Sequence, residues 1–163
     1  MVMKNLKNLF LTPLRPAQIP KWIPIVLIIL TLVGFSDATY LTIEHYQNEI
    51  PPCTIGGCES VLTSQYAVVA GLPISLIGAI YYLILTILLF IYLDFKREIF
   101  LRTALLVPVI GFLASAGLMF IMFFIIKSFC PYCAVSAIVS SSIFIISIYA
   151  IAKSRNNQAI QRL

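Results

Sequence analysis

Four long apolar stretches constrain this chain more than any other feature. They run over about 22–46, 73–93, 103–126 and 131–152, and nothing of domain size remains outside them. Each approaches or exceeds the roughly 20 apolar residues with which an α-helix crosses about 30 Å of hydrocarbon. Hydrophobic residues make up 61% of the chain and charged residues only 10%, which is unlike a soluble domain. We therefore expect one all-α integral membrane domain, residues 1–163, built as a bundle of four transmembrane helices.

The basic residues gather on one side of this predicted bundle. Ten of the eleven lysines and arginines precede the first span, separate the second from the third, or follow the fourth. Positively charged residues stay on the cytoplasmic side of a membrane, so both termini and the lead-in 1–21 are expected in the cytoplasm. The first span has full spanning length, and we expect it to be retained, not cleaved as a signal peptide. The net charge of +5 thus reflects topology, and no nucleic-acid binding is expected.

The opposite side holds a loop over about 47–72 and a tight turn between the third and fourth spans. The loop contains Pro51, Pro52, Gly56 and Gly57, which are turn formers that cannot continue a helix. The semi-apolar stretch that follows, 59–70, is predicted to form a short interfacial helix at the membrane surface. The expected fold is a four-helix bundle with an external, cysteine-bearing loop and this short helix.

All four cysteines, Cys53, Cys58, Cys130 and Cys133, lie on or next to the external side. Thiols outside the cytoplasm can form and keep disulfides. Cys130 and Cys133 form a Cys-Pro-Tyr-Cys motif at the start of the fourth helix, where the helix dipole and the motif favour a thiolate. A disulfide between Cys53 and Cys58 would close a short ring and add little stability. We therefore expect all four to be catalytic and to exchange disulfides, with the loop swinging onto Cys130.

A relay of this kind needs a final electron acceptor. The sequence offers no haem-ligand pair, flavin fingerprint or iron–sulfur spacing. A lipid-soluble quinone that enters between the helices beside Cys133 fits the apolar, aromatic surroundings. The alternative is a non-enzymatic membrane scaffold, in which the cysteines bind zinc or form static disulfides. The enzyme interpretation predicts a quinone and no metal.

A few polar side chains in the spans are further candidates. Asp37, Tyr40 and Glu44 share one helix face by their spacing and could relay protons, with Asp37 as the first choice. His45 is expected to be interfacial, because it lies next to water. The adjacent tyrosines at 81 and 82 are expected to serve packing or an aromatic belt.

Several segments together resemble the vitamin K epoxide reductase family, in particular compact bacterial members that act in place of a DsbB-type oxidase. These segments are 34–42, 53–64, 71–78 and 129–133. The order of the cysteines is that of the family, with a spaced loop pair first and the C-x-x-C last. In the DsbB type, the C-x-x-C lies in the first external loop.

The resemblance implies an oxidoreductase in the bacterial inner membrane that reoxidises a thioredoxin-like protein of the DsbA type and reduces a quinone. In this scheme Cys53 meets the partner protein, Cys58 forms a transient bridge with Cys130, and Cys133 faces the quinone. Disulfide bond formation outside the cytoplasm would depend on this activity.

The resemblance also bears on residues around the cysteines. Ser64 matches a hydroxyl position of the family beside the loop cysteines, and Ser136 is a second candidate quinone contact. Ala137 stands where the animal enzymes have a tyrosine, so epoxide reduction is not expected. No thioredoxin domain follows the fourth helix, so the partner is expected to be a separate chain.

Overall fold

The computed structural model describes residues 20, 22–47, 51 and 57–160, with side chains for all of these except 98 and 155–160. Residues 1–19, 21, 48–50, 52–56 and 161–163 lie outside the described residues, and so does Cys53. The described part contains four helical spans that are long and apolar enough to cross a membrane, Trp22–Gln47, Ile74–Phe95, Ile99–Ile126 and Pro131–Ser154. The expected all-α membrane bundle is therefore confirmed.

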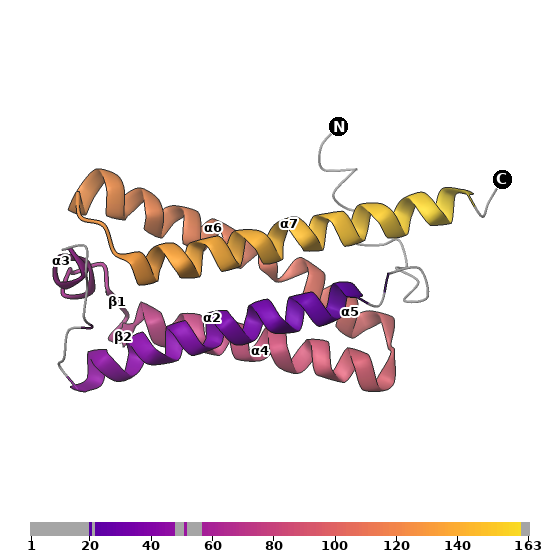
Figure 1. The fold of residues 1–163 in the computed structure, drawn as a ribbon, viewed down its shortest axis with the longest axis horizontal. Coiled ribbons are helices and arrows are strands. Elements are labelled where there is room, and N and C mark those ends of the chain that lie inside the picture. Colours follow the sequence, from indigo (N-terminus) through magenta and orange to yellow (C-terminus); the bar gives the residue numbers. More distant parts are fainter. Residues whose placement is uncertain (1–19, 21, 48–50, 52–56, 161–163) are drawn as a thin grey trace.

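Helix α2 (Trp22–Gln47) and helix α7 (Pro131–Ile160) form the centre of the bundle (Figure 1). Helix α2 packs against α7 and α4 (Ile74–Phe95), and α7 also packs against α6 (Pro108–Phe120). A hydrogen bond from Thr86 of α4 to Thr31 of α2, 2.9 Å long, joins two of these helices. Polar contacts of this kind hold membrane helices together where lipid offers no hydrophobic drive for association.

The outward surface of the bundle is apolar. Ile110, Leu113 and Ile138 are each more than 60% exposed, at 69%, 64% and 65%. A helix that is hydrophobic all round is typical of a membrane span, because lipid tails solvate its outer face. The chain is a multi-pass membrane protein.

The third span is not the single helix that we expected over 103–126. It starts at Glu98 and consists of α5 (Glu98–Leu106), α6 and the π-helix η2 (Ile121–Ile126). Pro108 lies in the first turn of α6 and has no N–H group, so the hydrogen-bond ladder is interrupted there. Helix α7 also continues past the expected 152 to Ile160.

The expected interfacial helix over 59–70 is wrong in most of its length. Helix α3 covers only Cys58–Leu62, and a small antiparallel hairpin of β1 (Val68–Val69) and β2 (Leu72–Pro73) follows. The two residues between the strands have positive φ angles, 54° at Ala70 and 81° at Gly71. This is the backbone of a type I′ turn, and alanine is not a residue that signals one.

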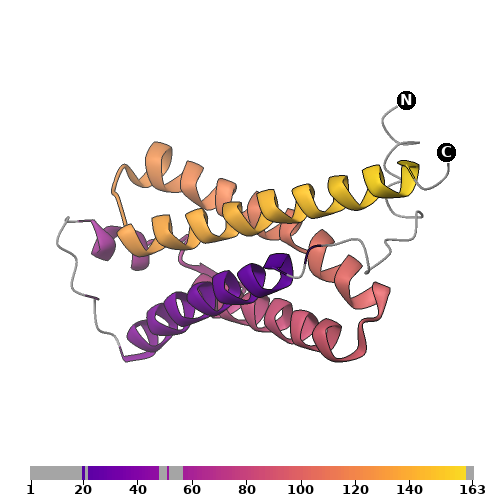
Figure 2. The ribbon, with the colours of Figure 1, turned by 45° about the vertical axis from the view of Figure 1, so that its right-hand side comes forward.

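The described cysteines and two basic residues lie at opposite ends of the bundle. Helix α3, the hairpin, the end of η2 and the start of α7 lie together at one end in both views (Figures 1 and 2). The start of α2, the α4–α5 connection and the end of α7 lie at the other end. Lys96 and Arg97 belong to that connection. The described cysteines and these basic residues are therefore separated by the length of the bundle.

Candidate active site

Two cysteines from distant parts of the chain are buried together. Cys58, in α3, is 1% exposed, and Cys130, which precedes α7, is 0% exposed. They share a hydrophobic cluster with Met122 of η2. Cys58 is disulfide-bonded, whereas Cys130 and Cys133 are free thiols. A disulfide therefore lies against a reduced dithiol.

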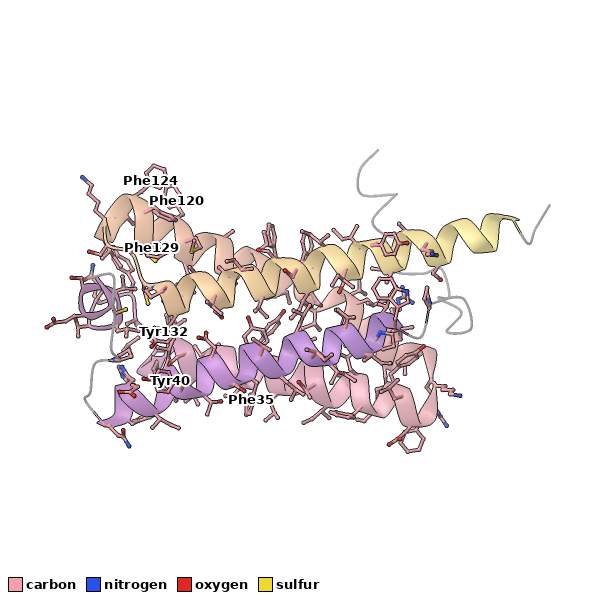
Figure 3. The ribbon with its side chains drawn as sticks, in the orientation of Figure 1. Phe35, Tyr40, Phe120, Phe124, Phe129 and Tyr132 are labelled. Carbon is pink, nitrogen blue, oxygen red and sulfur yellow. The ribbon has the colours of Figure 1, made fainter. Side chains whose placement is uncertain are left out.

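Gly57 explains how α3 comes so close to the start of α7. Its φ of 135° is a conformation that only glycine adopts readily. A Cβ atom added there would lie 2.8 Å from the carbonyl oxygen of Phe129. Figure 3 shows Phe129 on the side of η2 and α7 that faces α3. The residues immediately before Cys58 and Cys130 are thus in direct backbone contact.

Cys130 occupies the N-cap position of α7. Its carbonyl oxygen accepts a hydrogen bond from the N–H of Ala134 at 3.1 Å, and Pro131 is the first helical residue. Hydrogen bonding from the Cys133 thiol lowers the pKa of Cys130 to about 7, against the opposing effect of burial. The backbone N–H groups of Tyr132 and Cys133 contribute to this lowering of the pKa. An N-cap side chain accepts such N–H groups in general, and here the acceptor is a sulfur atom.

The π-helix η2 supports the same sulfur site from the other side. The backbone N–H of Cys130 donates to the Sδ atom of Met122 at 3.4 Å. Met122 is only 2% exposed. Single π-helical turns are frequent at functional sites, because they shift the side chains of one turn relative to the next. Here the turn brings a thioether onto the reactive cysteine.

A cavity of about 280 Å³ lies beside the thiol pair, bordered by α2, α4, α6, η2 and α7. Most of its wall is apolar, with side chains such as Leu41, Ile74, Ile110 and Leu118. A cavity of this size with apolar walls and a few polar groups is typical of a small-molecule site.

The candidate residues named from the sequence meet at this cavity. Cys133, Ser64, Ser136 and Asp37 all line it, although they come from α2, α7 and the segment after α3. Tyr40 does not line it. Its ring packs on the ring of Tyr132, with the centroids 5.6 Å apart and the ring planes tilted by 44°. The two residues lie near each other in Figure 3. Asp37 is thus the one member of the proposed relay face that reaches the cavity.

The carboxyl group of Asp37 is not saturated with hydrogen bonds. Its Oδ2 atom is buried and has no hydrogen-bond partner within the described part of the chain. Asp37 also lies close enough to interact electrostatically with Cys130, Cys133 and Tyr82. A buried polar atom without a partner calls for an explanation, and an ionisable group inside a membrane span indicates a functional site.

The two adjacent tyrosines do more than pack or form an aromatic belt, which were the roles expected for them from the sequence. The Tyr82 hydroxyl donates to the carbonyl oxygen of Ser136 at 3.1 Å and lies 3.2 Å from its Oγ atom. Gly34 makes room for the ring, since an added Cβ would lie 2.5 Å from it. Tyr81 and Tyr82 both line the cavity. Polar groups within an apolar span tend to face protein, and that signal could have identified them.

Comparison with known proteins identifies the family of this chain. The family model described as the vitamin K epoxide reductase family matches residues 25–148, a range that contains all four cysteines and most of each span. A search of curated proteins finds no significant match. Because the family model covers most of the chain, this protein belongs to the vitamin K epoxide reductase family.

Proposed function

We propose that this chain is a thiol:quinone oxidoreductase that reoxidises a separate thioredoxin-like protein of the DsbA type. Membership of its family makes it a membrane thiol–disulfide oxidoreductase, and the family is quinone-linked in general. One observation carries the finer proposal. The disulfide-bonded Cys58 is buried against Cys130, and the neighbouring thiol, Cys133, lines the cavity.

The cysteines define a direction for the electrons. The partner's dithiol reduces the loop pair, proposed as Cys53 and Cys58, by exchange through a mixed disulfide. The Cys58 thiolate then attacks Cys130 of an oxidised helix-end pair, and Cys133 leaves as a thiolate beside the cavity. A second attack, by Cys53 on Cys58, restores the loop disulfide. The structure, with Cys58 oxidised and Cys130 and Cys133 reduced, corresponds to the state after this transfer.

The cavity fits a quinone. Its apolar walls suit the ring of a lipid-soluble molecule, and the carboxyl group of Asp37, when protonated, can donate a hydrogen bond to a carbonyl oxygen at one end. Bound there, a quinone supplies the oxidising power, since it takes up the two electrons and two protons released when Cys130 and Cys133 form a disulfide. Ser136 remains a proposed contact. Ser64 shapes the wall, because its hydroxyl already donates to the carbonyl oxygen of Val61 at 2.8 Å.

Asp37 is proposed to move protons between the thiols and the bound quinone. Its position beside both cysteines supports this role. General acid–base groups typically contribute about 10²–10⁴-fold to a rate. We expect Asp37→Asn to lower kcat for quinone reduction about 10²-fold and to leave quinone binding within a few-fold. Asp94→Asn, at an exposed carboxyl at the end of α4, is the matched control. Equal rates for the two variants would contradict the proton role.

The proposed location is the inner membrane of a bacterium, with both termini in the cytoplasm and the cysteine-bearing end outside. The placement of Lys96 and Arg97 at the end opposite the described cysteines supports this orientation. The alternative is a non-enzymatic membrane scaffold whose cysteines bind zinc or form static disulfides. Metal analysis and thiol trapping of the purified protein distinguish the two, because a relay gives reducible, partner-linked species and a zinc site gives stoichiometric metal.

Anaerobic mixing of the purified protein with a reduced thioredoxin-like substrate and quinone tests the function. We expect quinone absorbance to fall with one quinone consumed for each substrate dithiol oxidised. Cys53→Ala should block this transfer but leave quinone reduction by dithiothreitol, which can reach the helix-end pair directly. Equal loss with both reductants would contradict the division between the two pairs, and a wild-type protein that leaves the quinone oxidised would contradict the function.

A further inference from the structure

Two further hydroxyl groups in the cavity have no assigned role. The hydroxyl of Tyr81 and the Oγ atom of Ser140 are both buried, and neither has a hydrogen-bond partner within the described residues. Both residues line the cavity. The two groups are neighbours, but their geometry does not meet that of a hydrogen bond. Leaving a buried hydroxyl unpaired costs free energy, so a ligand that accepts a hydrogen bond there would be favoured.

The fold places the Tyr81 hydroxyl against a third helix, α6. Tyr81 extends from α4 towards α6, where its hydroxyl lies against Gly111. Any side chain at position 111 would overlap the tyrosine. The neighbouring Tyr82 is different, because Ser136 already satisfies its hydroxyl. Tyr81 is therefore the tyrosine that keeps a free donor for a ligand.

The distance along α7 from Cys133 to the hydroxyl pair of Tyr81 and Ser140 suits a quinone. Ser140 follows Cys133 by seven residues on α7, which corresponds to two turns and about 10 Å along the helix axis. That length accommodates, end to end, a contact to sulfur, a six-membered ring with one carbonyl group, and a hydrogen bond. Cys133 and Asp37 lie at one end of this distance, and Tyr81 and Ser140 lie at the other.

We propose that Tyr81 and Ser140 form a distal subsite that binds the quinone carbonyl oxygen remote from Cys133. The inference rests on the proposed function and concerns how a para-quinone, whose two carbonyl oxygens point in opposite directions, is oriented in the cavity. The tyrosine hydroxyl donates to the carbonyl oxygen. The serine hydroxyl donates to the second lone pair of the same oxygen. The subsite thereby sets which edge of the ring faces the thiol.

The chain contains matched controls for both residues. Ser147 lies on the same face of α7, and its Oγ atom is likewise buried and unpaired among the described residues, but it does not line the cavity. Tyr92 lies on α4, is 7% exposed and does not line the cavity either. Ser147→Ala and Tyr92→Phe therefore remove the same atoms without reaching the proposed ligand.

The test uses short-chain ubiquinone analogues labelled with carbon-13 at one carbonyl or the other, bound to the purified protein and observed by infrared spectroscopy. In the wild type we expect one labelled carbonyl stretch at the lower frequency of a hydrogen-bonded group. Tyr81→Phe should return this band towards its unbonded frequency and weaken quinone binding about tenfold, as expected for a lost hydrogen bond. Ser140→Ala should give a smaller shift in the same direction.

The outcomes separate this inference from the proposed function. If the wild type reduces quinone, but Tyr81→Phe leaves both carbonyl bands and the affinity as they are in Tyr92→Phe, the distal subsite is wrong and the function stands. If the wild type neither binds nor reduces the analogues, the function fails and the subsite fails with it. A band shift in Tyr81→Phe and Ser140→Ala that is absent in Tyr92→Phe and Ser147→Ala supports the subsite.

Discussion

At the scale of single residues, the two cysteines of the C-x-x-C motif have different environments. The motif predicted a reactive pair, but it did not say which sulfur is the thiolate. The structure assigns this to Cys130, because Cys130 caps α7 and accepts hydrogen bonds from the Cys133 thiol and from backbone N–H groups. Cys133 lines the cavity and is the sulfur next to the proposed acceptor.

This asymmetry gives a pH prediction. With a pKa of about 7, Cys130 is a neutral thiol in more acidic solution and a thiolate in more alkaline solution. Cys133→Ala removes the leading hydrogen-bond donor, so the pKa of Cys130 should rise towards the value of about 8.5 for a free cysteine. The measurement is the ultraviolet absorbance of the thiolate against pH in a Cys53→Ser/Cys58→Ser background. Subtracting the curve of the additional Cys130→Ser variant removes the tyrosine signal. An unchanged midpoint in Cys133→Ala would contradict the assignment.

The residues of the cavity were only partly accessible from the sequence. Cys133, Ser64, Ser136 and Asp37 could be named because cysteine spacing, a family motif and a carboxyl group in a span are conspicuous. The polar groups of Tyr81, Tyr82 and Ser140 indicate that these residues face protein, but they do not show that the three meet at one cavity. In a helix that is apolar on every face, periodicity does not show which side faces protein, and that is decided by contacts such as those at Gly34 and Gly111.

At the scale of elements, the short cap formed by α3 and the hairpin positions Cys58. Gly57 joins this cap to the start of α7, because only a residue without Cβ fits against Phe129. The sequence predicted a longer helix here, since its semi-apolar pattern does not reveal the turn at Ala70 and Gly71. The cap is thus the part of the site that the sequence predicted least well.

Gly57→Ala should separate the cap from the helix-end pair. The added methyl group conflicts with the Phe129 carbonyl oxygen, so exchange between Cys58 and Cys130 should slow about tenfold or more, while reduction of quinone by dithiothreitol persists. Gly71→Ala is the control, because Gly71 also has a positive φ but has no atom within 4 Å of an added Cβ. Rapid-quench trapping of mixed disulfides measures the exchange. Equal slowing in both variants would show that backbone strain alone is responsible.

At the scale of the whole molecule, the four spans were predictable because spanning length and hydropathy are strong signals. The interruptions in the third span were less predictable. Pro108 marks the break between α5 and α6, but a proline is also tolerated within membrane helices, so the proline alone did not predict a break. The π-helical end has no sequence signal that we recognise.

The orientation in the membrane can be tested with two similar lysines. Lys96 and Lys127 are both exposed, and both have a left-handed backbone conformation, with φ angles of 48° and 53°. They follow α4 and η2, respectively, at opposite ends of the bundle. In a variant whose native cysteines are serines, Lys127→Cys should react with an impermeant maleimide in intact cells. Lys96→Cys should react only after the membrane is permeabilised. The reverse pattern would contradict the external location of the thiol site.

The central claim is that electrons leave the protein from Cys133 to a quinone in the cavity. In Cys130→Ser, Cys133 loses its disulfide partner and remains beside the bound quinone, in a helix that begins at Pro131. The most direct measurement is the visible spectrum of this variant with quinone shown to be bound. We expect a broad, long-wavelength charge-transfer absorbance that is absent from Cys130→Ser/Cys133→Ser. A colourless single variant, or colour that survives in the double variant, would contradict it.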